Sequence, residues 1–308
     1  MGGSGGYSYG GTRNSAWQPP NLENSLQQTR QMADEADLAS VFADALSKIN
    51  QVDTEALNRH KEEILKALQS EFEDASDLRG GGSYTRHSYV NGLSDVDVLL
   101  DLGAFSDSTI PNKADSRAVL ADIEKRLRQR FPKTDITSGH MAVTMRFSDG
   151  LELQILPAFR YHSGYRIPNP QGAGWTITRP KIFAKLLRER NAEVGGKLLP
   201  CIKLAKQICN NKGIEVGSYH LENMALKAFE RYTGSKSEEE MLRHFFNQAK
   251  VLVATKMKDI TGQEVYVDRY LSSNSARTQL ARQLSGLEEE IIEAKGNADA
   301  WRRLLDLS

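Results

Sequence analysis

Residues 81–100 read Gly-Gly-Ser-Tyr-Thr-Arg-His-Ser-Tyr-Val-Asn-Gly-Leu-Ser-Asp-Val-Asp-Val-Leu-Leu, and this stretch decides the fold. A glycine-serine turn is followed, about a dozen residues later, by two aspartates one residue apart in an apolar run. Residues i and i+2 of a β-strand lie on the same face. We therefore expect Asp95 and Asp97 to project together, while Val96 and Val98 point into a core.

Two adjacent carboxylates favour a bound cation, because they repel each other when nothing positive lies between them. Mg²⁺ is usually held by one or two carboxylates together with substrate phosphates. Glycine lets the backbone approach a phosphate and offer N–H donors, and the hydroxyl of Ser83 adds another group. The segment therefore predicts a metal and nucleotide site, and the alternative is a Gly-rich loop followed by an exposed acidic strand edge.

The composition is that of a globular protein without a bias toward nucleic acid. The 308 residues are 39% hydrophobic and 26% charged, and 40 basic residues balance 40 acidic ones. The balance argues against a general nucleic-acid binder, and no apolar run reaches the length of a membrane span. We therefore expect a cytoplasmic protein with no membrane partner and no stable nucleic-acid partner.

One region departs from this balance. Between residues 160 and 212, eleven Lys and Arg outnumber two acids. A local positive excess suits a polyanion such as a triphosphate, and the alternative is a solvated basic face.

The order of the expected elements predicts two lobes. Apolar spacing predicts helices over 28–50, 53–72 and 114–131, and strands over 141–147 and 151–156 joined by a hairpin at Asp149-Gly150. Strands are expected to end near residue 159, and everything beyond Pro180 reads as helical. This order predicts an α+β fold, with a catalytic lobe packed on a helical lobe. The expected parts are a flexible Gly-rich tail over 1–24, the catalytic lobe with the N-terminal helices over 25–175, and the helical lobe over 176–308.

The chain resembles a known family at these residues. Gly82-Ser83 followed by Ser94-Asp95-Val96-Asp97 is similar to the signature of the polymerase-β-like nucleotidyltransferases, which include the 2′-5′ oligoadenylate synthetases. More narrowly, the segments 152–158 and 218–222 resemble those of the CD-NTases, bacterial enzymes similar to cyclic GMP-AMP synthase. The resemblance implies a polymerase-β-like lobe with a mixed sheet, packed on an α-helical lobe that completes the donor-nucleotide cleft.

The resemblance also implies an activity. Such an enzyme joins nucleoside triphosphates, ATP among them, without a template and with Mg²⁺ or Mn²⁺. It releases pyrophosphate and makes cyclic or short linear oligonucleotide second messengers, which act on an effector in anti-phage defence. The alternatives are nucleotidyl transfer onto RNA or protein, and a catalytically silent scaffold that binds nucleotides.

The third carboxylate of the site requires a choice. Most members of the superfamily have an aspartate two residues before a Leu-Pro pair, and that position is Gln154 here. An amide is a poor substitute for an anionic metal ligand and cannot take a proton. Glu152 lies on the same strand face. Some bacterial members of the family carry this Glu-x-Gln arrangement, so the resemblance implies that the catalytic and metal-binding roles belong to Asp95, Asp97 and Glu152.

The helical part supplies the expected nucleotide contacts. Lys203 and Lys206 lie one helical turn apart and share a face. The resemblance implies that they meet the triphosphate, and the alternative is two solvated lysines. Ser218 can cap a helix or hold phosphate, and Tyr219 can stack on a nucleobase or lie in the core. The expected nucleotide-binding residues are Gly82, Ser83, Lys203, Lys206, Ser218 and Tyr219.

Overall fold

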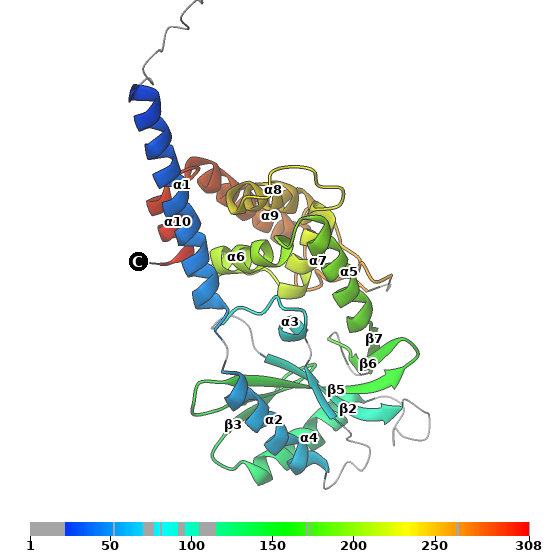
Figure 1. Cartoon of the computed structure of the whole chain (residues 1–308). Coiled ribbons are helices and arrows are strands. Elements are labelled where there is room, and N and C mark those ends of the chain that lie inside the picture. Colours follow the sequence, from blue (N-terminus) through cyan, green and yellow to red (C-terminus); the bar gives the residue numbers. More distant parts are fainter. Residues whose placement is uncertain are drawn as a thin grey trace, which may run out of the picture.

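The computed structural model consists of two lobes (Figure 1). The sheet lobe contains every strand that the structure describes and lies below the helical lobe in this view. The described residues are 22–51, 53–69, 77–80, 82–91, 96–104, 115–170, 172, 174–262 and 265–307.

Within these residues, seven strands form one mixed sheet. The strands are β1 (Asp77–Gly80), β2 (Val96–Ala104), β3 (Asp135–Ser138), β4 (Val143–Arg146), β5 (Glu152–Tyr161), β6 (Gly164–Pro168) and β7 (Trp175–Thr178). Their main order is β1-β2-β5-β4-β3, with β6 beside β5 and β7 beside β6. β2 and β5 are parallel and the other pairs are antiparallel. The expected α+β fold with a mixed sheet is confirmed.

The hairpin expected at Asp149-Gly150 is confirmed, because β4 and β5 pair around it and Gly150 has a φ of +86°. The end of the sheet differs from the expectation. We expected the strands to stop near residue 159, whereas β5 continues to Tyr161 and is followed by β6 and β7. These two strands are short, and β6 ends in Pro168, a residue that usually marks a loop or a strand end.

Two helices cover one face of the sheet (Figure 1). They are α2 (Thr54–Gln69) and α4 (Ser116–Arg130), and α4 begins where the Asp115 carboxylate accepts a hydrogen bond of 3.0 Å from the Arg117 N–H. Leu120, Ile123 and Leu127 recur at helical spacing and are buried against the strands. The opposite face of the sheet is left to the short helix α3 (Gly82–Thr85) and to the helical lobe.

The helical lobe is built around large apolar side chains such as Trp301, Phe245 and Phe246, which are fully buried. Its helices from residue 180 onward are α5 (Pro180–Glu193), α6 (Leu198–Asn211), α7 (Ser218–Ala228), α8 (Glu238–Leu252), α9 (Asn274–Glu293) and α10 (Ala298–Leu305). The helices expected beyond Pro180 are therefore present.

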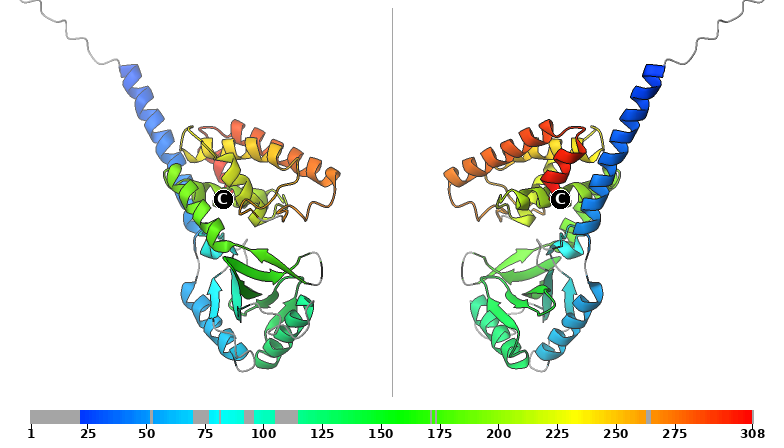
Figure 2. Two further views of the ribbon diagram at one scale, coloured as in Figure 1. Left: turned by 90° about the vertical axis from the view of Figure 1, so that its right-hand side faces the viewer. Right: turned by 90° about the vertical axis from the view of Figure 1, so that its left-hand side faces the viewer.

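The first helix, α1 (Leu22–Ile49), belongs to the helical lobe, which differs from the expected boundaries. We expected it in the catalytic lobe over 25–175. Val41, Phe42 and Ala45 instead join the core of the helical lobe, where the Phe42 ring meets the Trp301 ring at 4.8 Å. Spacing shows which face of a helix is apolar but not which lobe receives it. The N-terminal half of α1 extends away from both lobes (Figure 2).

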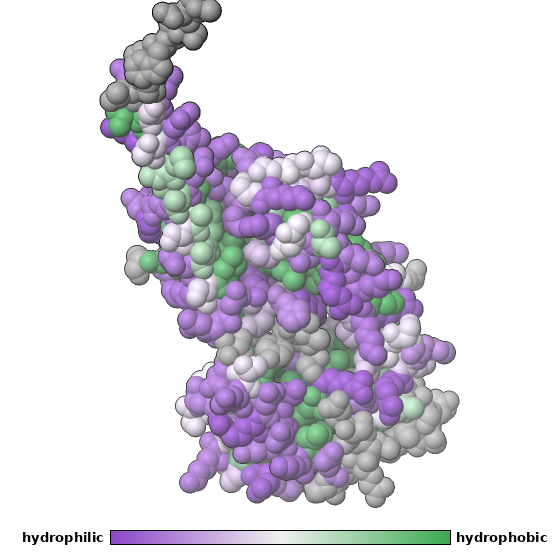
Figure 3. Space-filling model, in the orientation of Figure 1, coloured by the Kyte–Doolittle hydropathy of each residue, from purple (hydrophilic) through white to green (hydrophobic). Residues whose placement is uncertain are grey.

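The surface is mainly hydrophilic on the face shown in Figure 3, with hydrophobic residues gathered where α1 lies against the helical lobe. Among the helices that the structure describes, none combines the length and the apolar character needed to cross a membrane.

Candidate active site

Asp97 lies on the sheet face that the two covering helices leave open. Val96 and Val98 are buried in the core on the other face, as the alternation of β2 predicts. The parallel register of β2 and β5 places Asp97 directly opposite Gln154. The expected partner Asp95 lies outside the described residues, so its projection beside Asp97 stays a prediction.

The Gly82-Ser83 turn packs directly on the Asp97 carboxylate. Gly82 has a φ of +51°, and a Cβ atom built on it would lie 1.5 Å from Asp97 Oδ2. Only glycine allows this approach. The Ser83 N–H donates a hydrogen bond to the Asp97 side chain. The structure thus brings Gly82, Ser83 and Asp97 together, as a phosphate and metal site requires.

The electrostatic setting of Asp97 is unusual for an aspartate. Burial raises the pKa of its carboxyl group, the charge of Arg86 lowers it, that of Glu222 raises it and that of Lys206 lowers it. The effect of burial on the pKa is the largest of these, so the ionised carboxylate of Asp97 is destabilised by its surroundings in the folded protein. A cation beside Asp97 would relieve that cost.

Glu152 reaches the same sheet face but has a protein partner. It lies opposite Arg146 in β4, whose Nε donates to Glu152 Oε2 at 2.8 Å. Arg146 Nη1 also donates to Asp135 Oδ2 at 3.2 Å, which completes a row of three charged side chains across the strands. If Glu152 is a metal ligand, its carboxylate must leave Arg146 to bind the metal ion. In the pairing of β2 with β5, Gln154 lies directly opposite Asp97, and Glu152 lies two residues before it in β5.

Lys203 and Lys206 both lie on α6 but have different surroundings. Lys203 is half-buried, and its ammonium donates to the side chain of Asn50. Lys206 is buried and donates to Glu222 Oε1 at 2.8 Å and to the Ser88 carbonyl at 2.9 Å. Burial lowers the pKa of both ammonium groups. Their contact with a triphosphate stays a prediction.

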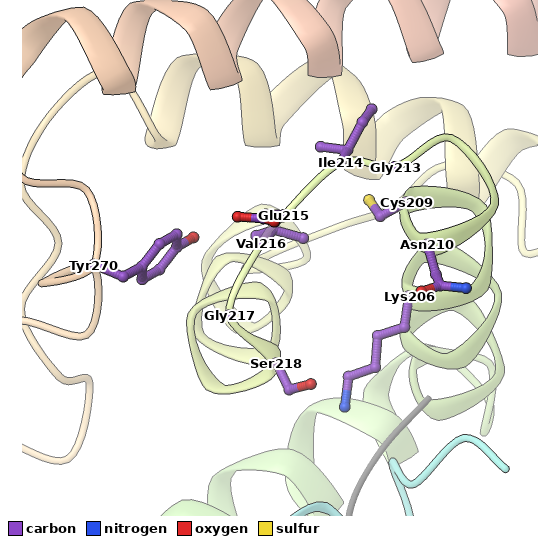
Figure 4. A pocket seen from close by; sticks show the side chains of 10 residues that line it. All are labelled: Lys206, Cys209, Asn210, Gly213, Ile214, Glu215, Val216, Gly217, Ser218 and Tyr270. Atoms are coloured by element: carbon purple, nitrogen blue, oxygen red, sulfur yellow. The ribbon is translucent and has the colours of Figure 1, made fainter. Parts of the chain in front are cut away.

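A cavity of about 640 Å³ opens beside Lys206, between the end of α6, the segment 213–217 and the start of α7. Ser218 is exposed at this cavity, and its side chain and that of Lys206 point toward each other in Figure 4. Tyr270 lines the cavity from a loop after α8. A hydroxyl, an ammonium group and a helix N-terminus together favour an anion.

Tyr219 has the next place on α7 and is partly buried. Its hydroxyl donates to Asp259 Oδ2 at 2.9 Å, and its ring lies 4.6 Å from that of Phe183. Burial strongly raises the pKa of the Tyr219 phenol, so the hydroxyl stays protonated. Tyr219 therefore packs at the edge of the core, which was the alternative to base stacking, and its stacking on a nucleobase stays a prediction.

Three residues at the centre of the site are not among those expected from the sequence to bind metal or nucleotide. Arg86, Ser88 and Glu222 surround the turn, yet Glu222 was quoted only as part of a segment that resembles the family. Glu222 gave no clear signal of its own, because α7 also carries the polar residues His220 and Asn223, and the sequence does not show which of them is buried against a charged partner.

The chain also matches a known protein family. The model of the Second Messenger Oligonucleotide or Dinucleotide Synthetase domain matches residues 32–191, just over half of the chain. The chain belongs to this family. As a CD-NTase it is a nucleotidyltransferase, which confirms the predicted family and enzyme class.

Relatives of this CD-NTase agree with the assignment. A probable cyclic nucleotide synthase of Bacillus cereus (strain VD146) is 25% identical over 250 residues, which are 70% of this chain and 74% of the relative. The fold is shared with E. coli MS115-1 CdnC solved with ATP, at a TM-score of 0.66 and 16% identity over 86% of this chain and 96% of the other. It is also shared with Bradyrhizobium diazoefficiens CdnG solved with GTP, at a TM-score of 0.68 and 16% identity over 87% and 95% of the two chains.

The buried His220 is expected to make the stability of this CD-NTase depend on pH. The side chain is fully buried on α7, Nδ1 lies 2.9 Å from the Tyr270 hydroxyl, and burial lowers its pKa to about 4. In the unfolded chain the imidazole of His220 is protonated below about pH 6.5, whereas in the folded protein it stays neutral down to about pH 4. We expect this group to remove about 3 kcal/mol of the free energy of unfolding between those pH values.

Urea unfolding of the wild type and of His220→Gln at pH 7 and pH 4.5 measures this effect. The variant should lose less stability than the wild type on acidification. An equal loss in both proteins would assign the acid sensitivity to other groups.

Proposed function

We propose that this CD-NTase joins nucleoside triphosphates, ATP among them, into cyclic or short linear oligonucleotide second messengers. The observation that carries the proposal is the Asp97 carboxylate, buried against the Gly82-Ser83 turn with Arg86 and Lys206 as its cationic neighbours. The B. cereus relative, a probable cyclic nucleotide synthase, and the ATP and GTP in the CdnC and CdnG structures support it. The product would act on a defence effector in the cytoplasm of a cell attacked by phage.

The proposed cofactor is Mg²⁺ or Mn²⁺. In the described residues no group of three His, Cys, Asp or Glu side chains is placed to hold a metal ion, and Asp95 lies outside them. The partly buried carboxylate of Asp97 nevertheless fits a hard cation, which needs only one or two carboxylates when phosphates complete its shell. Asp95, Asp97 and Glu152 would hold the metal. It would stabilise negative charge on the phosphates and lower the pKa of an attacking hydroxyl.

The other roles belong to the chain's own groups. The Gly82-Ser83 turn offers its backbone and the Ser83 hydroxyl to the triphosphate, and Lys203 and Lys206 add positive charge. Ser218 at the cavity would bind a terminal phosphate, while Tyr219 would stack on a base. Catalysis of this kind is mainly positioning and electrostatic stabilisation.

A second function has one observation in its favour. Gln154, not an acid, lies opposite Asp97, so a nucleotide-binding scaffold without turnover is the rival proposal. Transfer of nucleotides onto RNA or protein is the other alternative.

One experiment separates these functions. The protein is incubated with each labelled nucleoside triphosphate and Mg²⁺ or Mn²⁺, and phosphatase-resistant products are separated, with Asp95→Asn/Asp97→Asn as the control. A small product absent from the control supports the synthase. Bound nucleotide without pyrophosphate release selects the scaffold, and label on added RNA or protein selects macromolecular transfer.

The role of Glu152 can be tested through its ion pair. We expect Glu152→Gln to lower kcat by about 10²-fold, as loss of one electrostatic contribution to a transition state does. Arg146→Gln releases the Glu152 carboxylate and should leave kcat unchanged or raised. Equal losses in both variants would show that Glu152 serves only to pair with Arg146.

A further inference from the structure

A buried ionic cluster joins the two lobes beside Asp97. Its centre is Glu222 of α7, which is fully buried and accepts three hydrogen bonds. Arg86 Nε donates to Oε2 at 2.7 Å, while Lys206 Nζ and Ser88 Oγ donate to Oε1 at 2.8 and 2.6 Å. Burial raises the pKa of Glu222, but Arg86 and Lys206 together lower it to about 2, so the carboxylate is ionised.

Hydrogen bonds lead from this cluster to the proposed reaction centre. Lys206 donates to the Ser88 carbonyl at 2.9 Å, and the Ser88 N–H donates to the Ser83 carbonyl at 3.0 Å. The Ser83 N–H in turn donates to Asp97. Glu222 is therefore connected to Asp97 through Ser88 and Ser83, although it comes from the other lobe.

Arg86 is fixed in the same way. It follows the Gly82-Ser83 turn in the chain, yet its surroundings come from the helical lobe. Its guanidinium lies 5.4 Å from the centre of the Phe183 ring and 5.5 Å from that of Tyr219, while Glu222 accepts from its Nε. Removal of the Glu222 charge would leave Arg86 and Lys206 as buried cations without their shared counter-charge.

We propose that Glu222 is a positioning residue for nucleotidyl transfer. It holds residues 83–88 in the conformation that places the Gly82-Ser83 turn on Asp97, and it fixes the charges of Arg86 and Lys206 there. It does so without touching the reacting atoms. The inference rests on the proposed function and adds that the helical lobe sets the geometry of the turn in the sheet lobe.

Glu222→Gln tests the inference because glutamine keeps the shape of the side chain and removes its charge. We expect kcat per folded molecule to fall by about 10²-fold, since small displacements of a reacting group have effects of this size. KM for the nucleoside triphosphate should stay the same or fall, because the net charge beside the turn becomes more positive. Amide hydrogen exchange over 82–91 should become faster.

Glu288→Gln is the matched control. Glu288 is also buried in the helical lobe and accepts from one lysine, Lys250, and one amide, Asn247, but it lies on α9. This variant should lose stability while keeping the kcat of its folded molecules and the wild-type exchange over 82–91. Ser88→Ala is a milder second variant that removes one hydrogen bond to Glu222 and should give a smaller loss of kcat.

The outcomes are distinct. If Glu222→Gln and Glu288→Gln have the same kcat per folded molecule and the same exchange over 82–91, Glu222 is only a structural ion-pair partner and the inference is wrong. If the wild type makes no product from any triphosphate, the proposed function fails. In that case the exchange data still decide whether Glu222 holds the turn.

Discussion

Asp97→Asn is expected to reduce nucleotidyl transfer by at least about 10²–10³-fold, the effect of losing one main electrostatic contribution to a transition state. The same change should leave the protein at least as stable as the wild type. Burial raises the pKa of the Asp97 carboxyl group, so the ionised side chain opposes folding at neutral pH, and the amide does not. Product formation from labelled triphosphates and the thermal midpoint measure the two effects.

Asp101→Asn on the same strand is the control for Asp97→Asn. Asp101 is fully buried and pairs with Arg79 at 3.6 Å and Arg160 at 3.3 Å. An asparagine at this position would leave the positive charges of the two arginines without their counter-charge. It should show the opposite pattern, a lower thermal midpoint with kcat retained by folded molecules. Turnover by Asp97→Asn at the wild-type rate would remove Asp97 from the mechanism.

Gly82→Ala is expected to lower kcat by about 10²-fold, because the turn and the carboxylate cannot keep their present contact. The added methyl group would lie 1.5 Å from Asp97 Oδ2 and 2.4 Å from its Cγ, so one of the two segments must move. The positive φ of +51° adds backbone strain of about 1–2 kcal/mol.

Gly150→Ala separates the clash from the strain. Gly150 also has a positive φ, +86°, but a Cβ atom there meets nothing within 4 Å. This variant should lose stability to a similar degree and keep its kcat. Equal kcat values for Gly82→Ala and Gly150→Ala, measured on folded protein at saturating triphosphate, would show that the contact with Asp97 is not needed.

The sequence allowed the local parts of the site to be predicted. Alternation along β2 placed Asp97 on the open face. The Gly82-Ser83 turn was expected to approach a phosphate, and this contact stays a prediction, whereas its close contact with Asp97 was not foreseen. The hairpin at Asp149-Gly150 followed from turn chemistry. Each of these features depends on residues that are neighbours in the chain.

The remaining parts depend on contacts between distant segments. Glu222 and Arg86 are 136 residues apart, and no periodic pattern indicates that they meet. The pairing of Glu152 with Arg146 is local, because the two residues flank the predicted hairpin, but strand alternation alone does not show whether this acid meets an arginine or a metal ion. Membership of α1 in the helical lobe likewise depends on which apolar surface receives Val41 and Phe42.

Glu222 is connected to the Gly82-Ser83 turn through Ser88, and this connection bears on which part of the chain can act alone. The match to the family model ends at residue 191, before both Lys206 and Glu222. A fragment cut at that point would carry the whole Gly-Ser and Asp-x-Asp signature but lack the groups that organise it. If Glu222 holds the turn as proposed, we expect the smallest active unit to be larger than the segment by which the family is recognised.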